Sequence, residues 1–144
     1  MGRIDDAFRK AEAQRGKVSS AEETFSGYGP PIADFTDPES PLVESYRTLR
    51  TNIQRAIRTK SVKSILITSA AQGEGRTQTV SNLAVLFSAI EGNKTLLVDA
   101  DLRNPELHAI FQLTDGPGLS ELLHGTTSVE AVIHPTRIGN LKVV

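Results

Sequence analysis

The sequence predicts an α/β domain with a parallel β-sheet. Two short apolar runs, 65–67 and 94–98, have the length and the Ile, Leu and Val content of buried strands. Apolar residues at helical spacing lie between the two runs: Val80, Leu83, Ala84, Phe87 and Ile90. A strand, a helix and a second strand in this order predict a right-handed crossover unit with parallel strands.

The composition indicates a globular protein with room for one domain. The chain has 144 residues, of which 38% are hydrophobic and 23% charged. Its net charge of −1 argues against a general nucleic-acid or anionic-membrane binder. Cysteine is absent, which excludes disulfides and thiolate chemistry. No apolar run is long enough for a secretory signal or a membrane span, so we expect a cytoplasmic protein.

The chain divides into a short helix, a linker and one folded domain. Residues 1–15 predict an amphipathic helix, because their apolar residues fall on one side, although a frayed tail fits the same pattern. Residues 16–40 are rich in Gly, Ser, Glu, Asp and Pro and predict a flexible linker, since such a composition buries too little apolar surface to fold alone. The folded domain then covers 41–144.

A long helix is predicted over 41–60, with Pro41 in its first turn. Glu44, Arg47 and Arg50 recur every three positions and therefore share a face. This face is either solvated, with an intrahelical Glu44–Arg47 pair, or a charged surface that pairs with another subunit. The apolar residues form a stripe along the same helix: Leu42, Val43, Tyr46, Leu49, Ile53, Ala56 and Ile57.

A glycine-rich loop joins the first apolar run to the next helix, and it reads Ala-Ala-Gln-Gly-Glu-Gly-Arg-Thr over 70–77. A strand, a glycine loop and a helix are the setting of a phosphate-binding loop, in which backbone N–H groups and the helix N-terminus face an anion. Thr77 stands where a hydroxyl ligand of Mg²⁺ is expected. The loop departs from GxxxxGK[ST] at Ala70 and at Arg76, where arginine is not a conservative replacement for lysine. An ordinary glycine-rich turn is the alternative.

Two carboxylates, Asp99 and Asp101, follow the second apolar run. Parallel pairing places Asp99 at the carboxyl end of its strand, beside the glycine loop, where ligands bind in open α/β sheets. A carboxylate there can hold Mg²⁺ through water or accept a proton from a substrate hydroxyl. The alternative is that both residues cap helices or turns.

The last forty residues predict smaller elements. Short helices are expected at 105–111 and 118–124, a further turn at 129–133, and the opening of a third strand at 141–144. Gly92 suits the C-cap of the preceding long helix. The histidines lack metal-ligand spacing, so surface or capping roles are expected for His108, His124 and His134.

Four segments together resemble the bacterial tyrosine kinases of capsule and exopolysaccharide biosynthesis, P-loop enzymes related to MinD and ParA. Residues 44–52 match the family's ExxRxxR helix, 68–77 its Walker A loop, and 97–105 its Walker A′ motif of an apolar run followed by DxDxR. The stretch from 107 to 125 is similar to the segment that follows in the family. The A′ motif and the ExxRxxR helix together are far more specific than the loop alone.

The resemblance implies a P-loop NTPase-type, three-layer fold with ATP and Mg²⁺ as cofactors. Thr77 and Asp99 would then lie on the metal, and Asp99, Asp101 and Arg103 would be the catalytic residues. The nucleotide would be bound by Gln72, Gly73, Glu74, Gly75, Arg76, Thr77 and Gln78.

The resemblance also implies partners. The family uses its ExxRxxR helix for ring oligomerisation, so Glu44, Arg47 and Arg50 would join copies of this chain. A membrane polysaccharide co-polymerase is a further expected partner, and it would bring a cytoplasmic chain without its own membrane span to the membrane.

Two family features have no counterpart in the sequence. They are the Walker B strand, an apolar run ending in aspartate, and the C-terminal tyrosine cluster; Tyr28 and Tyr46 are the only tyrosines. We therefore expect the first half of a kinase domain, with a sheet truncated before the Walker B strand. Three functions stay open: a tyrosine autokinase module regulating capsular or exopolysaccharide synthesis, a catalytically deficient nucleotide-sensing or scaffolding relative, and a MinD- or ParA-like positioning ATPase. The third lacks support because the extra lysine of that group is missing near the start of the loop.

Overall fold

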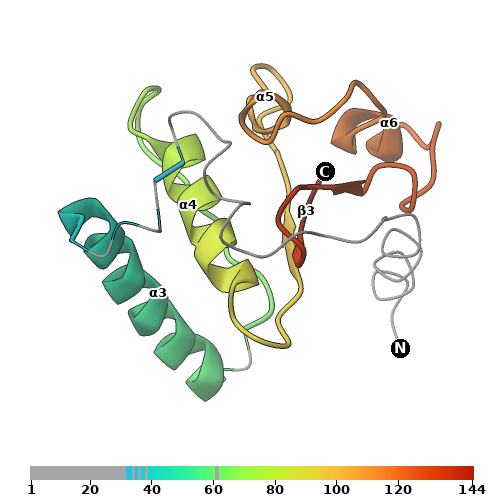
Figure 1. The fold of residues 1–144 in the computed structure, drawn as a ribbon. Helices are drawn as coiled ribbons and strands as arrows, with labels where there is room; N and C mark the ends of the chain where they lie inside the picture. The colour runs from blue at the N-terminus through green and yellow to red at the C-terminus, as the bar shows by residue number, and fades with distance from the viewer. Residues whose placement is uncertain (1–31, 34, 36, 38, 61) are drawn as a thin grey trace.

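The computed structural model describes residues 32–33, 35, 37, 39–60 and 62–144. The predicted helix at 1–15, most of the predicted linker and Tyr28 lie outside these residues. Figure 1 shows the helices α3 (Pro41–Lys60), α4 (Arg76–Ser88), α5 (Leu107–Ile110) and α6 (Leu119–Leu123), and the strands are β1 (Thr95–Leu97), β2 (His134–Pro135) and β3 (Leu141–Val143).

The three described strands form one small sheet in the order β1-β3-β2. β1 and β3 are parallel, with Leu96 opposite Lys142, whereas β2 is antiparallel to β3, with His134 opposite Val143. The parallel pair confirms the predicted α/β class. β2 was not predicted, because a His-Pro pair carries no strand pattern; proline lacks the N–H donor, and such a strand is suited to the edge of a sheet.

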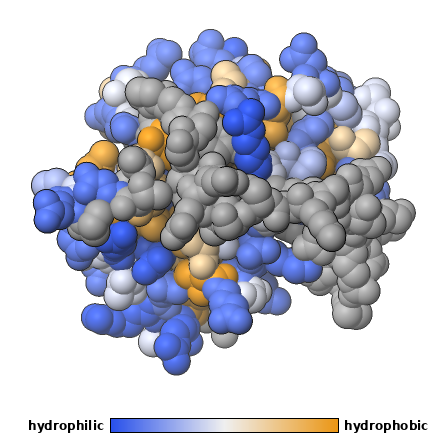
Figure 2. Space-filling model, in the orientation of Figure 1, coloured by the Kyte–Doolittle hydropathy of each residue, from blue (hydrophilic) through white to orange (hydrophobic). Residues whose placement is uncertain are grey.

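α4 is the central helix of the fold. It lies between α3 and the strands (Figure 1) and packs against α3, β1 and β3. The core that it helps to form is apolar and consists of Ile32, Ala84, Val85, Leu97, Leu107, Phe111, Ile138, Leu141 and Val143. On the face drawn in Figure 2, hydrophilic side chains predominate and the apolar ones show as separate small areas.

Described residues of the predicted linker pack against the helices. Ile32 and Ala33 are buried, and the Ala33 N–H donates to Asn82 Oδ1 of α4 at 2.7 Å. Phe35 meets Tyr46 of α3 edge-on, with ring centroids 6.5 Å apart. Apolar side chains scattered at the end of a polar segment are therefore sufficient to anchor it.

The first apolar run does not form the predicted buried strand. Residues 62–69 have neither helix nor strand structure, and Leu66 is 84% exposed. The predicted crossover unit therefore has its helix, α4, and its second strand, β1, but lacks its first strand. An apolar run shows that a segment can be buried, but strand formation also needs a neighbour for its peptide groups. No described residue supplies that neighbour.

Two smaller expectations also need correction. On α3, Val43 is fully buried, but Leu42 and Leu49 of the predicted apolar stripe are 48% and 39% exposed. α4 ends at Ser88, so Gly92, with a φ of 78°, belongs to the turn that follows rather than to the helix C-cap. Residues 129–132 form turns, as expected. In the described part of the chain, no helix combines the length and the apolarity that a membrane crossing requires.

Candidate functional site

The glycine-rich loop is a tight turn that leads directly into α4. Gly73 and Gly75 have φ values of 83° and 79°, a left-handed conformation that other residues avoid. Gly75 is the N-cap of α4, and no side chain caps this helix end; the Thr79 N–H makes the first helical bond to the Gly75 carbonyl at 2.8 Å. The N–H groups of the first turn are therefore open to an external acceptor, as in anion sites at helix N-termini.

Two hydrogen bonds within the loop hold this shape. The Ala71 N–H donates to Glu74 Oε2 at 3.1 Å, and the Ser69 hydroxyl donates to the Ala71 carbonyl at 2.9 Å. Gln72 and Glu74 are exposed and Thr77 is half-buried. The loop is consequently held in shape by its own hydrogen bonds and is accessible from solvent.

An ion pair connects the loop to the DxDxR segment. Arg76 Nη2 lies 3.9 Å from Asp101 Oδ2, and both side chains are about two-fifths exposed, at 39% and 45%. A pair this exposed contributes about 0–1 kcal/mol to stability. Its importance is geometric, because it brings together the two segments that the sequence predicts to share a ligand.

Asp99 is held by the backbone that follows it. Its Oδ2 accepts hydrogen bonds from the N–H groups of Glu106 and Leu107 at 3.0 and 3.1 Å, and its Oδ1 accepts one from Asp101 at 3.0 Å. A carboxylate has about four acceptor positions, so three of them are taken. Asp99 thus caps α5, which is the structural alternative that the sequence left open for this residue.

Asp101, in contrast, has one oxygen directed at the loop. Its Oδ1 accepts from the N–H groups of Arg103 and Asn104 at 3.3 and 3.1 Å, while its Oδ2 faces Arg76. The Arg103 side chain is exposed and, among the described residues, forms no ion pair. The structure therefore brings Asp101 to the loop more directly than Asp99, a difference that the motif alone does not reveal.

A cavity of about 340 Å³ opens at the carboxyl ends of β1 and β3. Asp99 and Asp101 line it together with the last residues of the chain, Val143 and Val144, and the start of α6. His134 also lines it, and its Nε2 is 2.9 Å from the Pro117 carbonyl, so that nitrogen carries the donated proton. Ligands of open α/β sheets bind at this edge, and the cavity adds a recess beside the candidate site.

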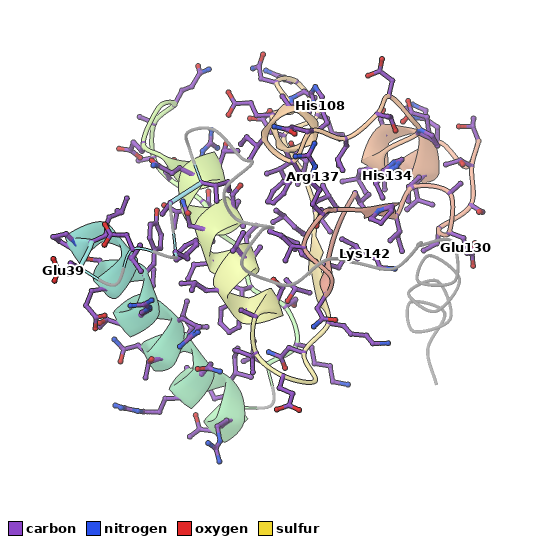
Figure 3. The ribbon with its side chains drawn as sticks, viewed as in Figure 1. Glu39, His108, Glu130, His134, Arg137 and Lys142 are labelled. Carbon is purple, nitrogen blue, oxygen red and sulfur yellow. The ribbon has the colours of Figure 1, made fainter. Side chains whose placement is uncertain are left out.

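The three histidines have separate positions. His108 lies on α5 and His134 beside α6, as labelled in Figure 3. His124 Nδ1 is 2.8 Å from the Ser120 carbonyl, within α6. A ring nitrogen of His124 and one of His134 each lie against a backbone carbonyl, which is consistent with the predicted capping roles of these two residues.

The start of α6 carries a capping interaction that the sequence analysis missed. The Gly118 N–H donates to Glu121 Oε2 at 2.8 Å. This hydrogen bond is the main reason why the pKa of Glu121 is lowered below its usual value. The spacing of an N-cap residue and a glutamate three positions later was the available signal.

The charged trio of α3 contains one intrahelical ion pair. Arg47 Nη1 is 3.8 Å from Glu44 Oε2, the intrahelical pair that the sequence offered as one alternative. Arg50 Nε is buried and has no hydrogen-bond partner within the described residues. The contact to another subunit stays a prediction.

Known proteins resemble this chain both in sequence and in fold. No family model matches the chain. The chain is 44% identical over 113 residues to the tyrosine-protein kinase YwqD of Bacillus subtilis strain 168, covering 78% of this chain and 47% of that protein. It resembles the kinase domain of Escherichia coli tyrosine kinase ETK with a TM-score of 0.72 and 28% identity, over 100% of this chain and 51% of that one. The chimerical protein CapA2B2 is similar with a TM-score of 0.67 and 38% identity, over 87% and 59% of the respective chains.

A glycine-rich loop that opens a helix beside parallel strands defines an α/β module of P-loop NTPase type. Within that class, the chain is a homologue of bacterial tyrosine-protein kinases by sequence and by fold. It spans about half the length of YwqD and of the putative tyrosine-protein kinase CapB of Staphylococcus aureus.

Proposed function

We propose that this chain is the ATP-binding module of a bacterial protein-tyrosine kinase that regulates capsular or exopolysaccharide synthesis. The observation that carries the proposal is the uncapped N-terminus of α4 behind two left-handed glycines, joined by the Arg76–Asp101 ion pair to the A′ segment. The 44% identity to YwqD and the fold shared with the ETK kinase domain support it.

The loop residues suit a triphosphate. Backbone N–H groups from Gln72 to Gln78 would donate to phosphate oxygens, and the α4 N-terminus would add its partial positive charge. Arg76 would shift from Asp101 toward the phosphates, since both compete for the same guanidinium.

The residues also suit Mg²⁺ delivered with the nucleotide. Among the described residues no cluster of three or more His, Asp or Glu side chains could hold a metal alone. Mg²⁺ in phosphotransfer sites needs only one or two protein ligands because the substrate phosphates and water supply the others. The Thr77 hydroxyl and the Asp99 carboxylate are the proposed ligands, with Asp99 acting directly or through water.

The bound nucleotide would supply the transferable phosphoryl group, and the protein would position it. Asp99 and Asp101 would orient the attacking hydroxyl and accept its proton, and Arg103 would balance their charge. The three backbone bonds to Asp99 would fix its carboxylate in place.

Oligomerisation and membrane recruitment complete the proposal. Glu44, Arg47 and Arg50 on α3 would join copies of the chain on the cytoplasmic side, and a polysaccharide co-polymerase would anchor the assembly. The buried Arg50 Nε, which has no described hydrogen-bond partner, supports a contact at this face.

A catalytically deficient nucleotide-sensing scaffold is the second candidate. Arg76 in the lysine position favours it, because the guanidinium is a broad planar group where a compact point charge is expected.

One experiment separates the two candidates. The chain is incubated with Mg²⁺ and ATP in the presence of a tyrosine-containing peptide polymer, and phosphotyrosine is detected by mass spectrometry. The kinase proposal expects phosphotyrosine that Asp99→Asn abolishes, with the exposed Glu91→Gln as a matched control. The scaffold proposal expects Mg²⁺-dependent ATP binding by calorimetry without phosphotyrosine. Absence of both signals contradicts both candidates.

A further inference from the structure

The positive charges of the chain are concentrated in one stretch. Residues 45–73 contain six of the 16 Lys and Arg residues and no Asp or Glu, so all 17 acidic residues lie elsewhere in the sequence. A net charge near zero argues against an anionic partner only where the two signs are evenly mixed. Here they are segregated, and the net charge of −1 conceals a strongly basic stretch in a chain that is otherwise acidic.

Four of these cations form one exposed surface at the end of α3, which we name the α3-end surface: Arg55, Arg58, Lys60 and Lys63. All four residues are exposed. Arg55 and Arg58 are three positions apart and share one side of α3, Lys60 is its last residue, and Lys63 follows closely. Within the described part of the chain, none of the four side chains forms an ion pair.

Stabilisation of the helix end accounts for only part of this surface. Cations in the last turn of a helix interact favourably with its negative C-terminus, and Arg58 and Lys60 are in that turn. Arg55 precedes the last turn and Lys63 lies beyond the helix. α3 also lies on the far side of α4 from the strands (Figure 1), where a broad surface can approach it. The charge and the placement together fit an external anionic partner.

We propose that the α3-end surface docks on an anionic phospholipid bilayer. Each Lys or Arg held near such a surface favours binding by about fivefold, so four give a gain on the order of several hundredfold. Val62, between Lys60 and Lys63, is 37% exposed, and an aliphatic side chain among cations suits the boundary between headgroups and acyl chains. Nucleic-acid bases stack on aromatic side chains instead, and residues 47–86 include none.

The docking is reversible and does not depend on nucleotide. A surface of a few cations holds a protein on a bilayer only weakly, because stable anchoring takes two signals. The α3-end surface therefore adds to any other anchor of the chain, and it turns the end of α3 toward the headgroups. Glu44, Arg47 and Arg50 near the start of α3 are not part of this surface, so the contact is separate from the proposed oligomer contact.

Vesicle sedimentation tests the docking with the whole chain and without ATP. Vesicles of phosphatidylcholine with about 30% phosphatidylglycerol are compared with vesicles of phosphatidylcholine alone. We expect binding to the anionic vesicles only, and a loss of about tenfold or more when the salt is raised to about 0.5 M, because salt screens exposed charges. Equal binding to both kinds of vesicle, or binding to neither, would overturn the proposal.

Single substitutions locate the contact. Lys60→Gln should weaken binding to the anionic vesicles by about fivefold, and Arg55→Gln combined with Arg58→Gln by about 25-fold. Lys94→Gln is the matched control, because Lys94 is also an exposed lysine and its replacement changes the net charge equally. It should change binding by less than about twofold. Circular dichroism checks that each variant keeps its helices. Equal effects of Lys60→Gln and Lys94→Gln would mean that net charge alone acts, and the docking surface would be wrong.

A competition arm separates the bilayer from other anionic partners. Double-stranded DNA and polyglutamate are each added to the vesicle-bound chain at a matched concentration of negative charge. We expect neither to release the chain, because neither offers an apolar boundary for Val62. Release by either polymer would show that the α3-end surface binds polyanions in general, and the assignment to a bilayer would fail.

Discussion

The guanidinium of Arg76 lies 3.9 Å from the carboxylate of Asp101, so the first residue of α4 contacts the segment that follows β1. Asp101 therefore pairs with the same guanidinium that a bound phosphate group would contact. The long arginine side chain spans the distance between the two loops.

Replacing Arg76 with lysine should strengthen Mg²⁺–ATP binding by about tenfold, equivalent to about 1.4 kcal/mol. Lysine is a compact charge that fits over the phosphates, and it forms a weaker geometric match to Asp101 than arginine does. Titration calorimetry measures the affinity, and Lys94→Arg is a control distant in sequence. An unchanged affinity would mean that the loop no longer has the shape of a phosphate site.

Removing the Asp99 carboxylate should destabilise the fold apart from any effect on catalysis. Asp99→Ala deletes the acceptor of three backbone hydrogen bonds, including two at the start of α5, and should lower the free energy of unfolding by about 1–3 kcal/mol. Asp99→Asn keeps one carbonyl acceptor and should cost less. Urea unfolding measures both, with Asp115→Ala as the exposed control. Equal stability of all three variants would contradict the capping role.

The Glu121 cap should make stability depend on acidity. Its pKa is lowered, mainly because the charged carboxylate accepts the Gly118 N–H. The bond therefore stabilises the fold at pH values above the usual glutamate pKa of 4.5, and this contribution is lost as the pH falls through the lower pKa of the folded state. Glu121→Gln should be less stable than the unchanged chain at pH 7, and the difference should shrink at pH 3. Urea unfolding at the two pH values tests this, with Glu91→Gln as the control; a constant difference would rule out the carboxylate as its cause.

Gly116→Ala should disturb the cavity wall. An added Cβ would lie 2.7 Å from Cε1 of His134, so the ring must move and its bond to the Pro117 carbonyl must weaken. We expect a loss of about 1–3 kcal/mol in unfolding free energy. His134→Ala in the same chain should recover part of that loss, because the two residues are in contact. Strictly additive effects in the double variant would show that the clash is relieved elsewhere.

Substitutions on α3 should separate assembly from stability. Glu44→Ala removes an exposed intrahelical pair worth about 0.3–0.5 kcal/mol, so the midpoint of thermal unfolding should hardly change. If α3 joins subunits, Glu44→Ala and Arg50→Ala should both lower the mass measured by light scattering. Thr48→Ala, at an exposed position of α3, is the control. Unchanged mass in both variants would remove the proposed oligomer contact.

Local sequence patterns predicted the elements whose hydrogen bonds form within the element itself or with residues close in sequence. The 20 residues of α3 and the helix α4 follow from periodicity. The crossover rule paired the run at 65–67 with the strand after α4, whereas the structure pairs that strand, β1, with β3. The exposed run at 65–67 could not be foreseen, because apolar composition says nothing about whether a neighbouring strand is present. The two aspartates of one motif also have different partners, Asp99 the start of α5 and Asp101 the loop, and only tertiary packing decides between them.

Asn82 is fully buried in α4 and joins two distant parts of the chain. Its Oδ1 accepts from the Ala33 N–H at 2.7 Å, and its Nδ2 donates to the Gln78 carbonyl at 2.8 Å, one turn after the glycine loop. The amide group of Asn82 therefore links the segment before α3 to the first turn of α4. Tension on that segment, such as tethering to another molecule would apply, would reach the backbone that is proposed to hold the phosphates.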